Sequence, residues 1–286
     1  MKTNCILIGD CRNKLEEIPD CYVDTIVTSP PYYGLRDYGV DGQIGLEESP
    51  QKYIDNMVDV FRKCRRVLKD DGTLWLNIGD SYWSDKNRNG YEFTENIGKN
   101  KNYMLRPGGV NDLNLKPKDL MGIPWRVALA LQADGWYLRS DIIWRKTNCM
   151  PEPVKDRPTN DHEYIFLFSK SRNYYYDYES VKEPASKNST KQNIDVVKRN
   201  KRSVWDVATA HEREAHFATF PGELIEPCIL AGSRKGGVVL DLFMGSGTVA
   251  CKAIELQRQY IGIELNPDYI DLINKKTSNI QIKLLV

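Results

Sequence analysis

The most constraining feature of the sequence is an apolar run that ends in an acid and a glycine-rich turn. Residues 238–243 are Val-Val-Leu-Asp-Leu-Phe, residues 244–247 are Met-Gly-Ser-Gly, and apolar side chains then recur at helical spacing over 248–257. A further strand pattern follows at 260–265. A buried strand, a tight turn, a helix and another strand make up the unit from which parallel sheets are built. We therefore predict an α/β fold.

The rest of the chain continues this alternation. Strand patterns lie at 5–9, 23–28, 73–80, 137–144 and 163–168, and helix patterns at 51–68, 124–133 and 221–231. Residues 70–72, Asp-Asp-Gly, are predicted to end one helix before the next strand begins. Strands that alternate with helices favour a parallel sheet.

Two polar stretches, 84–118 and 171–203, lack any sustained periodicity. We read the first as an inserted loop. The chain is therefore divided into one α/β domain, made of 1–171 and 204–286, with the loop over 84–118 inside it and a separate irregular segment over 172–203.

The glycine turn and a later acid indicate a ligand that contains a ribose. Gly245 and Gly247 let the backbone approach a ligand closely, and the helix that begins at Thr248 offers free N–H groups. Glu264 ends the next strand, where a carboxylate can accept hydrogen bonds from both ribose hydroxyls. The turn also matches the loose dinucleotide fingerprint, which leaves a nicotinamide dehydrogenase open. Asp241 would face a pyrophosphate unfavourably but suits the ammonium and sulfonium charges of S-adenosylmethionine, and we favour that cofactor.

A second motif, Ser29-Pro30-Pro31-Tyr32, directly follows a β-branched strand. The prolines fix φ and lack N–H groups, which predicts a rigid turn whose carbonyls have no local donors. Ser29 adds a hydroxyl and Tyr32 a flat ring, so the turn can accept hydrogen bonds from a planar amine and stack on its base. Such acceptors draw the amine nitrogen towards sp3 geometry and free its lone pair. A plain strand-ending proline turn is the alternative.

Together the two motifs resemble those of the exocyclic-amino DNA methyltransferases, in the permuted group whose catalytic motif precedes the main cofactor motif. Residues 141–146 and 161–166 are similar to later blocks of that family. The resemblance implies a Rossmann-like S-adenosylmethionine-dependent methyltransferase fold, with a mostly parallel sheet, helices on both faces and irregular DNA-recognition insertions. It also implies that the cofactor is bound by Asp10, Phe220, Asp241, Phe243, Gly245, Gly247, Thr248 and Glu264, with Asp10 reaching the adenine.

In this family, Ser-Pro-Pro-Tyr accompanies mainly the N4 amine of cytosine. We therefore predict a site-specific cytosine-N4 DNA methyltransferase whose catalytic residues are Ser29, Pro30, Pro31 and Tyr32. The same chemistry at adenine N6, and a DNA-binding protein without catalysis, are alternatives. The resemblance also implies that the strands ending at Ser29 and Asp241 are neighbours where the strand order reverses, a place where ligands bind. A paired base cannot reach such a pocket, so we expect the target base to be flipped out.

The basic residues are concentrated in the irregular segments, although Lys and Arg total 40 against 39 Asp and Glu. Residues 182–202 hold seven basic and two acidic residues, a net charge of +5, and residues 84–118 hold seven and four, a net charge of +3. Such segments suit phosphate contacts. We predict that 172–203 recognises the DNA target, through Lys187, Lys191, Lys198, Arg199, Lys201 and Arg202.

The remaining composition suggests where the protein works. The seven cysteines are scattered and form no Cys-x-x-Cys pair, which favours a reducing cytoplasm and predicts no metal site. We find no apolar run of about 18 residues and no signal-peptide pattern, and so expect no membrane contact. We expect a cytoplasmic protein, prokaryotic or phage-encoded, that acts on double-stranded DNA as a monomer or homodimer. The resemblance admits a cognate restriction endonuclease as a further partner.

Overall fold

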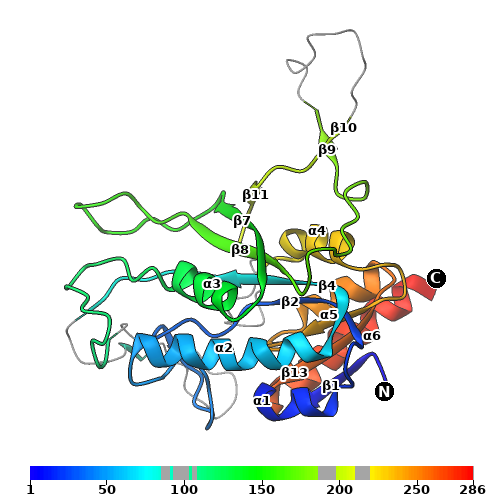
Figure 1. Cartoon of the computed structure of the whole chain (residues 1–286), viewed down its shortest axis with the longest axis horizontal. Helices are drawn as coiled ribbons and strands as arrows, with labels where there is room; N and C mark the ends of the chain where they lie inside the picture. The colour runs from blue at the N-terminus through cyan, green and yellow to red at the C-terminus, as the bar shows by residue number, and fades with distance from the viewer. Residues whose placement is uncertain (85–90, 93–102, 105–107, 186–197, 210–219, 286) are drawn as a thin grey trace.

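The computed structural model describes residues 1–84, 91–92, 103–104, 108–185, 198–209 and 220–285. Its centre is an eight-stranded sheet of order β1-β13-β12-β2-β4-β8-β7-β11 (Figure 1). The bounds in that order are Cys5–Ile8, Gln259–Glu264, Val238–Asp241, Val23–Thr28, Leu68–Ile78, His162–Ser169, Tyr137–Lys146 and Val204–Val207. Strand β8 is antiparallel to β4 and β7, and the other neighbours are parallel. The predicted α/β fold with a mostly parallel sheet is confirmed.

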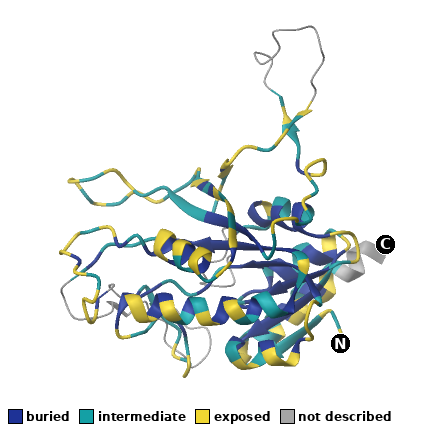
Figure 2. Ribbon diagram, viewed as in Figure 1, coloured by how far each residue is buried: buried dark blue, intermediate teal, exposed yellow. Residues whose placement is uncertain are grey.

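Helices cover both faces of this sheet. One face packs against α1 (Cys11–Lys14), α2 (Pro50–Val67) and α3 (Ile123–Ala133), and the other against α4 (Gly222–Gly232), α5 (Thr248–Glu255) and α6 (Ile270–Leu285). Side chains of β4 alternate between the two cores, with Leu74 and Leu76 in one and Trp75 in the other. The central strands β2 and β12 are accordingly buried between helices, whereas β7 and β11 at one side of the sheet are partly exposed (Figure 2). None of the helices in the described ranges is both long and apolar enough to cross a bilayer.

The junction between α2 and β4 differs from the prediction. Residues 70–72 do not separate helix from strand, because β4 begins at Leu68, directly after the helix, and Leu68 pairs with Val23 of β2. The neighbouring strand offers hydrogen-bond partners to the backbone, so the chain extends at once despite its polar residues. Gly72 lies inside β4, where a Cβ atom would come within 2.9 Å of the Asp24 carbonyl oxygen.

The two polar stretches contain short strands that the sequence did not predict. In the first, β5 (Tyr91–Glu92) and β6 (Tyr103–Met104) form a small antiparallel sheet with β3 (Arg36–Asp37). In the second, β9 (Glu183–Pro184) pairs with β10 (Lys198–Arg199) in a hairpin that projects from the main sheet (Figure 1). A two-residue strand is too short to show any alternation in sequence. Strand β11 (Val204–Val207) returns the chain to the main sheet, where it pairs with β7.

The strand order reverses between β12 and β2, which pair in parallel. Helix α5 leads from β12 to β13 on one side, and α2 leads from β2 to β4 on the other. The strands that end near Ser29 and Asp241 are therefore neighbours, as predicted. Such a reversal leaves a crevice at the carboxyl ends of the strands.

Candidate active site

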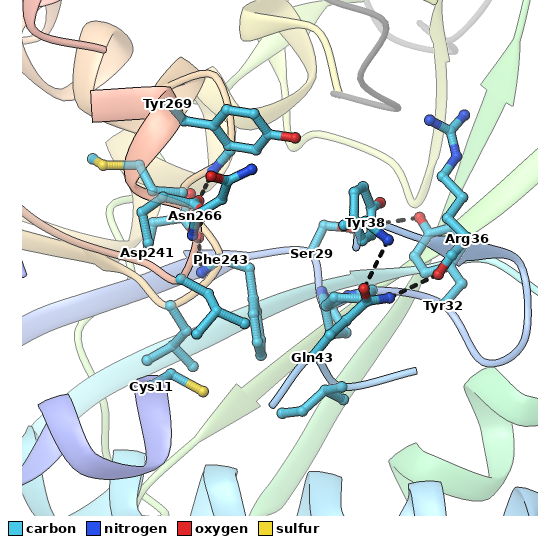
Figure 3. Close-up of a pocket in the computed structure, with 18 of the residues that line it drawn as sticks. Cys11, Ser29, Tyr32, Arg36, Tyr38, Gln43, Asp241, Phe243, Asn266 and Tyr269 are labelled. Carbon is cyan, nitrogen blue, oxygen red and sulfur yellow. Dashed lines mark hydrogen bonds between the residues drawn. The ribbon is translucent and has the colours of Figure 1, made fainter. Parts of the chain in front are cut away.

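A cavity of about 390 Å³ opens at this crevice. Asp241 and Tyr269 lie on one side, and Ser29 and Tyr32 lie across from them (Figure 3). The structure thus brings together the glycine turn and the Ser-Pro-Pro-Tyr turn, which are about 210 residues apart in the sequence.

The turn after β2 presents acceptor oxygens to the cavity. Ser29 and Pro30 both line it. The Pro31 carbonyl accepts a 2.9 Å hydrogen bond from the Tyr53 hydroxyl, a donor 22 residues further along the chain. No described residue donates a hydrogen bond to the Pro30 carbonyl. Ser29 Oγ and the Pro30 carbonyl therefore keep acceptor capacity that no described donor uses.

Tyr32 is held by residues that the sequence did not single out. Its hydroxyl lies 3.5 Å from Ser29 Oγ and donates a 2.6 Å hydrogen bond to Glu163 Oε2. Burial, and then the charge of Glu163, raise the pKa of Tyr32 well above its ordinary value, so the hydroxyl stays protonated. Gly79 leaves room for the ring, because a Cβ atom there would lie 2.7 Å from Tyr32 Cε2.

Glu163 is the centre of a polar cluster at the ends of β4, β7 and β8. Asn77 Nδ2 donates to Glu163 Oε2 at 3.1 Å, and Lys146 Nζ donates to Oε1 at 2.6 Å. The blocks at 141–146 and 161–166 contain Lys146 and Glu163, but sequence spacing gave neither a role. Their positions could have indicated a role, because Lys146 follows the strand predicted at 137–144 by two residues and Glu163 begins the strand predicted at 163–168.

Asp241 lies buried at the end of β12. Its Oδ1 accepts hydrogen bonds from Thr28 Oγ1 at 2.7 Å and from the Phe243 N–H at 3.1 Å. Burial raises the pKa of Asp241 to about 6, because these two bonds only partly replace water around the carboxylate.

Glu264 closes the same side of the cavity from β13. It accepts from the Gly245 N–H at 2.7 Å and from the Asn266 N–H at 2.8 Å. Burial raises the pKa of Glu264 to about 7, and the charge of Asp241 adds to the rise. Glu264 therefore fixes the glycine turn while facing the cavity, where it can also meet ligand hydroxyls.

The two glycines of the turn have different surroundings. Both have positive φ, +50° at Gly245 and +83° at Gly247, a conformation that favours glycine. Gly245 lines the cavity. Gly247 does not, and a Cβ atom there would come within 2.8 Å of the Ile273 side chain. Its absent side chain thus serves the packing of α5 against α6.

The cavity fits S-adenosylmethionine by its electrostatics and its walls. Asp241 and Glu264 are buried and have raised pKa values, yet neither forms an ion pair with any described lysine or arginine. A ligand with positive charge offsets the cost of ionising them. The predicted residues Phe220, Phe243 and Thr248 also line the cavity.

Asp10 lies at the far end of the same wall. Its carboxylate caps α1 by accepting from the Arg12 N–H at 2.8 Å and also pairs with the Arg12 guanidinium. Burial acts to raise the pKa of Asp10, but these Arg12 interactions outweigh it and the pKa lies below its ordinary value. Arg12 Nη2 donates to the Gly42 carbonyl, which ties Asp10 to the loop after the Ser-Pro-Pro-Tyr turn.

That loop, residues 33–45, forms a cavity wall that sequence reasoning missed. Gln43 Oε1 accepts from the Tyr38 N–H at 2.7 Å, and Gln43 Nε2 donates to the Arg36 carbonyl at 2.7 Å (Figure 3). Tyrosines and glycines that recur directly after the catalytic motif were the available signal. Asn266 and Tyr269, beyond β13, were likewise missed.

The predicted DNA surface is placed only in part. Lys198 and Arg199 form β10, and Arg199 Nε and Arg202 Nε both donate to Glu183 Oε1, at 2.9 and 3.0 Å. Glu183 thus offsets part of the positive charge, and Lys198 and Lys201 form no ion pair among the described residues. The predicted residues Lys187 and Lys191 lie outside the described residues.

Within the described ranges, no group of three or more His, Cys, Asp or Glu side chains is placed to hold a metal ion.

Comparison with known proteins identifies the family. A family model described as DNA methylase matches residues 23–275. The chain belongs to the DNA methylase family. It is 52% identical to the Type II methyltransferase M.SmaI of Serratia marcescens over 271 residues, which cover 95% of this chain and 89% of that protein. This membership decides against the nicotinamide dehydrogenase that the glycine turn alone left open.

Solved structures of methylases share the fold. The PvuII DNA methyltransferase (cytosine-N4-specific) superposes with a TM-score of 0.68 at 18% identity, covering 100% of this methylase and 93% of that chain. TTHA0409 of Thermus thermophilus, solved in complex with S-adenosyl-L-methionine, has a TM-score of 0.61 at 24% identity and covers 96% and 95%. The fold is therefore that of the S-adenosylmethionine-dependent methyltransferases, and S-adenosylmethionine is the methyl donor of this family.

Proposed function

We propose that this methylase transfers a methyl group from S-adenosylmethionine to the N4 amine of a specific cytosine in double-stranded DNA. The observation that carries the proposal is the shared cavity in which Ser29 and Tyr32 face the buried acids Asp241 and Glu264. The name of the PvuII enzyme, which shares the fold, supports cytosine N4. The Type II relatives support a defined DNA site and suggest a cognate restriction endonuclease as partner.

The protein groups divide the work of the reaction between two halves of the cavity. Asp241 and Glu264 would hold the cofactor, which supplies a methyl group already activated by its positive sulfur. Ser29 Oγ and the Pro30 carbonyl would accept hydrogen bonds from the two amine hydrogens, which frees the nitrogen lone pair. The nitrogen becomes cationic and acidic on methylation, so its proton can leave without a strong base nearby. Positioning and preorganised acceptors therefore supply much of the acceleration.

The cavity requires an unpaired base. Ser29 is only partly exposed and lines the cavity at the strand ends. An amine inside a base pair cannot approach it, so the target cytosine would be flipped out and stacked on the Tyr32 ring.

One experiment tests the substrate directly. The protein is expressed in a host free of DNA methylation, the DNA is digested to nucleosides, and modified nucleosides are identified by mass spectrometry. We expect 4-methylcytosine, and less of it in a parallel culture that expresses Ser29→Ala at the same level. Finding 6-methyladenine instead would establish the adenine alternative.

The basic segment yields a separate prediction about DNA affinity. We propose that Lys198 and Lys201 contact phosphates, because both are basic and free of ion pairs among the described residues. The double variant Lys198→Glu/Lys201→Glu should weaken binding and reduce the slope of log K against log salt by roughly 2, about 0.9 for each lost phosphate contact. Fluorescence anisotropy at several salt concentrations measures this slope. The control is Lys235→Glu/Lys275→Glu, which changes two exposed lysines elsewhere. An equal slope in both double variants would contradict the proposal that Lys198 and Lys201 contact phosphates.

A further inference from the structure

Lys146 lies on the wall of the catalytic cavity opposite the cofactor acids. It is the last residue of β7. In the order of the sheet, β4, β8 and β7 lie on one side of β2, and β12 lies on the other side. Lys146, Glu163 and Ser29 all line the cavity. Because Asp241 and Glu264 occupy the cofactor side, the side with Lys146 is the one that a target base must enter.

The ammonium group of Lys146 is fixed in place. Its Nζ donates to Glu163 Oε1 at 2.6 Å and lies 5.2 Å from the centre of the Trp144 ring. The Lys146 side chain is 23% exposed and that of Glu163 is 14% exposed. Since Glu163 Oε2 also accepts from the Tyr32 hydroxyl at 2.6 Å, one carboxylate sets the position of both the Tyr32 ring and the ammonium.

The ammonium retains donor capacity. Lysine carries three N–H donors, and among the described residues only Glu163 accepts one from Nζ. The remaining N–H groups can be used by a ligand in the cavity.

We propose that Lys146 recognises the target base by donating a hydrogen bond to the O2 carbonyl of cytosine. The inference rests on the proposed cytosine-N4 activity and deepens it. Along one edge, cytosine presents its amine, a ring nitrogen and O2. Adenine superposed by its amine and adjacent ring nitrogen presents a C–H group where cytosine has O2, and the remaining N–H groups of the partly buried ammonium would face it without an acceptor. Lys146 would thus favour cytosine over adenine, with Glu163 as its positioning residue.

The test removes O2 from the substrate and the ammonium from the enzyme. In one duplex the target cytosine is replaced by a 2-aminopyridine C-nucleoside, which keeps the amine and adjacent ring nitrogen but has C–H in place of the carbonyl. Single-turnover methylation of both duplexes gives a rate ratio, cytosine over analogue, in which general damage to the enzyme cancels. We expect Lys146→Met to lower this ratio by roughly 10- to 100-fold, the range for a lost hydrogen bond to a charged group.

Lys170→Met is the matched control. Lys170 directly follows β8, at the end of that strand away from Glu163, and it does not line the cavity. Like Lys146 it is mostly buried, with 18% of its side chain exposed, and it pairs with a carboxylate, that of Asp70. It should keep the wild-type ratio. Glu163→Gln should lower the ratio part of the way, because the ammonium loses its fixed partner.

The outcomes separate the two proposals. An unchanged ratio in Lys146→Met overturns the role of Lys146, even if the overall rate falls. If Lys146→Met does not fold, Lys146→Leu, which also lacks a donor, replaces it, and again an unchanged ratio overturns the proposal. Methylation of adenine by the wild-type protein would instead overturn the cytosine-N4 function itself.

Discussion

Asp241→Asn should stabilise the ligand-free protein while weakening its affinity for S-adenosylmethionine by roughly 100-fold. The buried carboxylate has a pKa of about 6 against an ordinary 3.8, a difference worth about 3 kcal/mol when the group is ionised. Asparagine keeps an oxygen that can accept from Thr28 Oγ1 and the Phe243 N–H, so the local structure is retained. It loses the negative charge that the cofactor would balance.

The stability difference between Asp241→Asn and the wild type should depend on pH in a defined direction. The folded protein holds the Asp241 proton more tightly than the unfolded chain, so its contribution to stability falls as pH rises from about 4 to about 7. The unfolding free energy of Asp241→Asn should therefore match that of the wild type at the acid end and exceed it at neutral pH. Thermal or urea unfolding across this range, with calorimetry for the cofactor, measures both effects.

Glu264→Gln provides the contrast. Both oxygens of Glu264 accept backbone N–H groups, from Gly245 and Asn266, and a glutamine has only one oxygen to offer. We expect weaker cofactor binding without the gain in stability that Asp241→Asn shows. Equal stabilisation by both substitutions would contradict the hydrogen-bond pattern described for the glycine turn.

Ser29→Ala should reduce the rate of methyl transfer by about 100-fold or more, comparable to the loss of one preorganised hydrogen-bonding group in other enzymes. The dissociation constant for S-adenosylmethionine should stay within about twofold, because Asp241 and Glu264 are untouched. Single-turnover kinetics and calorimetry separate the two quantities. Ser81→Ala, at a half-buried serine beyond the end of β4 and outside the cavity lining, is the control and should leave both unchanged.

Two substitutions of Tyr32 divide its roles. Tyr32→Ala removes the ring and should lower turnover strongly, whereas Tyr32→Phe keeps the ring and loses only the hydroxyl, with its hydrogen bonds to Glu163, Asn77 and Ser29. We expect the smaller loss from Tyr32→Phe. If Ser29→Ala or Tyr32→Ala reduced cofactor affinity as much as turnover, the division of the cavity into cofactor and base sides would be wrong.

Most of the fold could be predicted because long elements carry their periodicity in the sequence. The strand predicted at 23–28 has those bounds in the structure, and the helix predicted at 124–133 covers Ile123–Ala133. Errors arose where pairing partners, not local preference, set the conformation. Leu68 adopts a strand conformation because it pairs with Val23. The two-residue strands β5, β6, β9 and β10 form only because each pairs with a neighbouring strand.

The site was predictable where a motif is contiguous and not where it is assembled. Ser29, Asp241 and Glu264 each end a strand within a recognisable turn. Lys146 and Glu163 each end or begin an ordinary strand, and only the pairing of β7 with β8 brings them to the same wall as Tyr32.

The sequence by itself determined the α/β class, the resemblance to amino-directed DNA methyltransferases and the strand ends at which the candidate site lies, because periodicity and turn chemistry act over a few residues. Only the tertiary structure decided which strand ends meet. It set Asp241 and Glu264 in one poorly solvated cavity, which raises both pKa values, and it fixed the Lys146 ammonium beside Tyr32 through Glu163. Burial and through-space contacts between distant segments produce these properties, and neither can be read from residues next to one another in the chain.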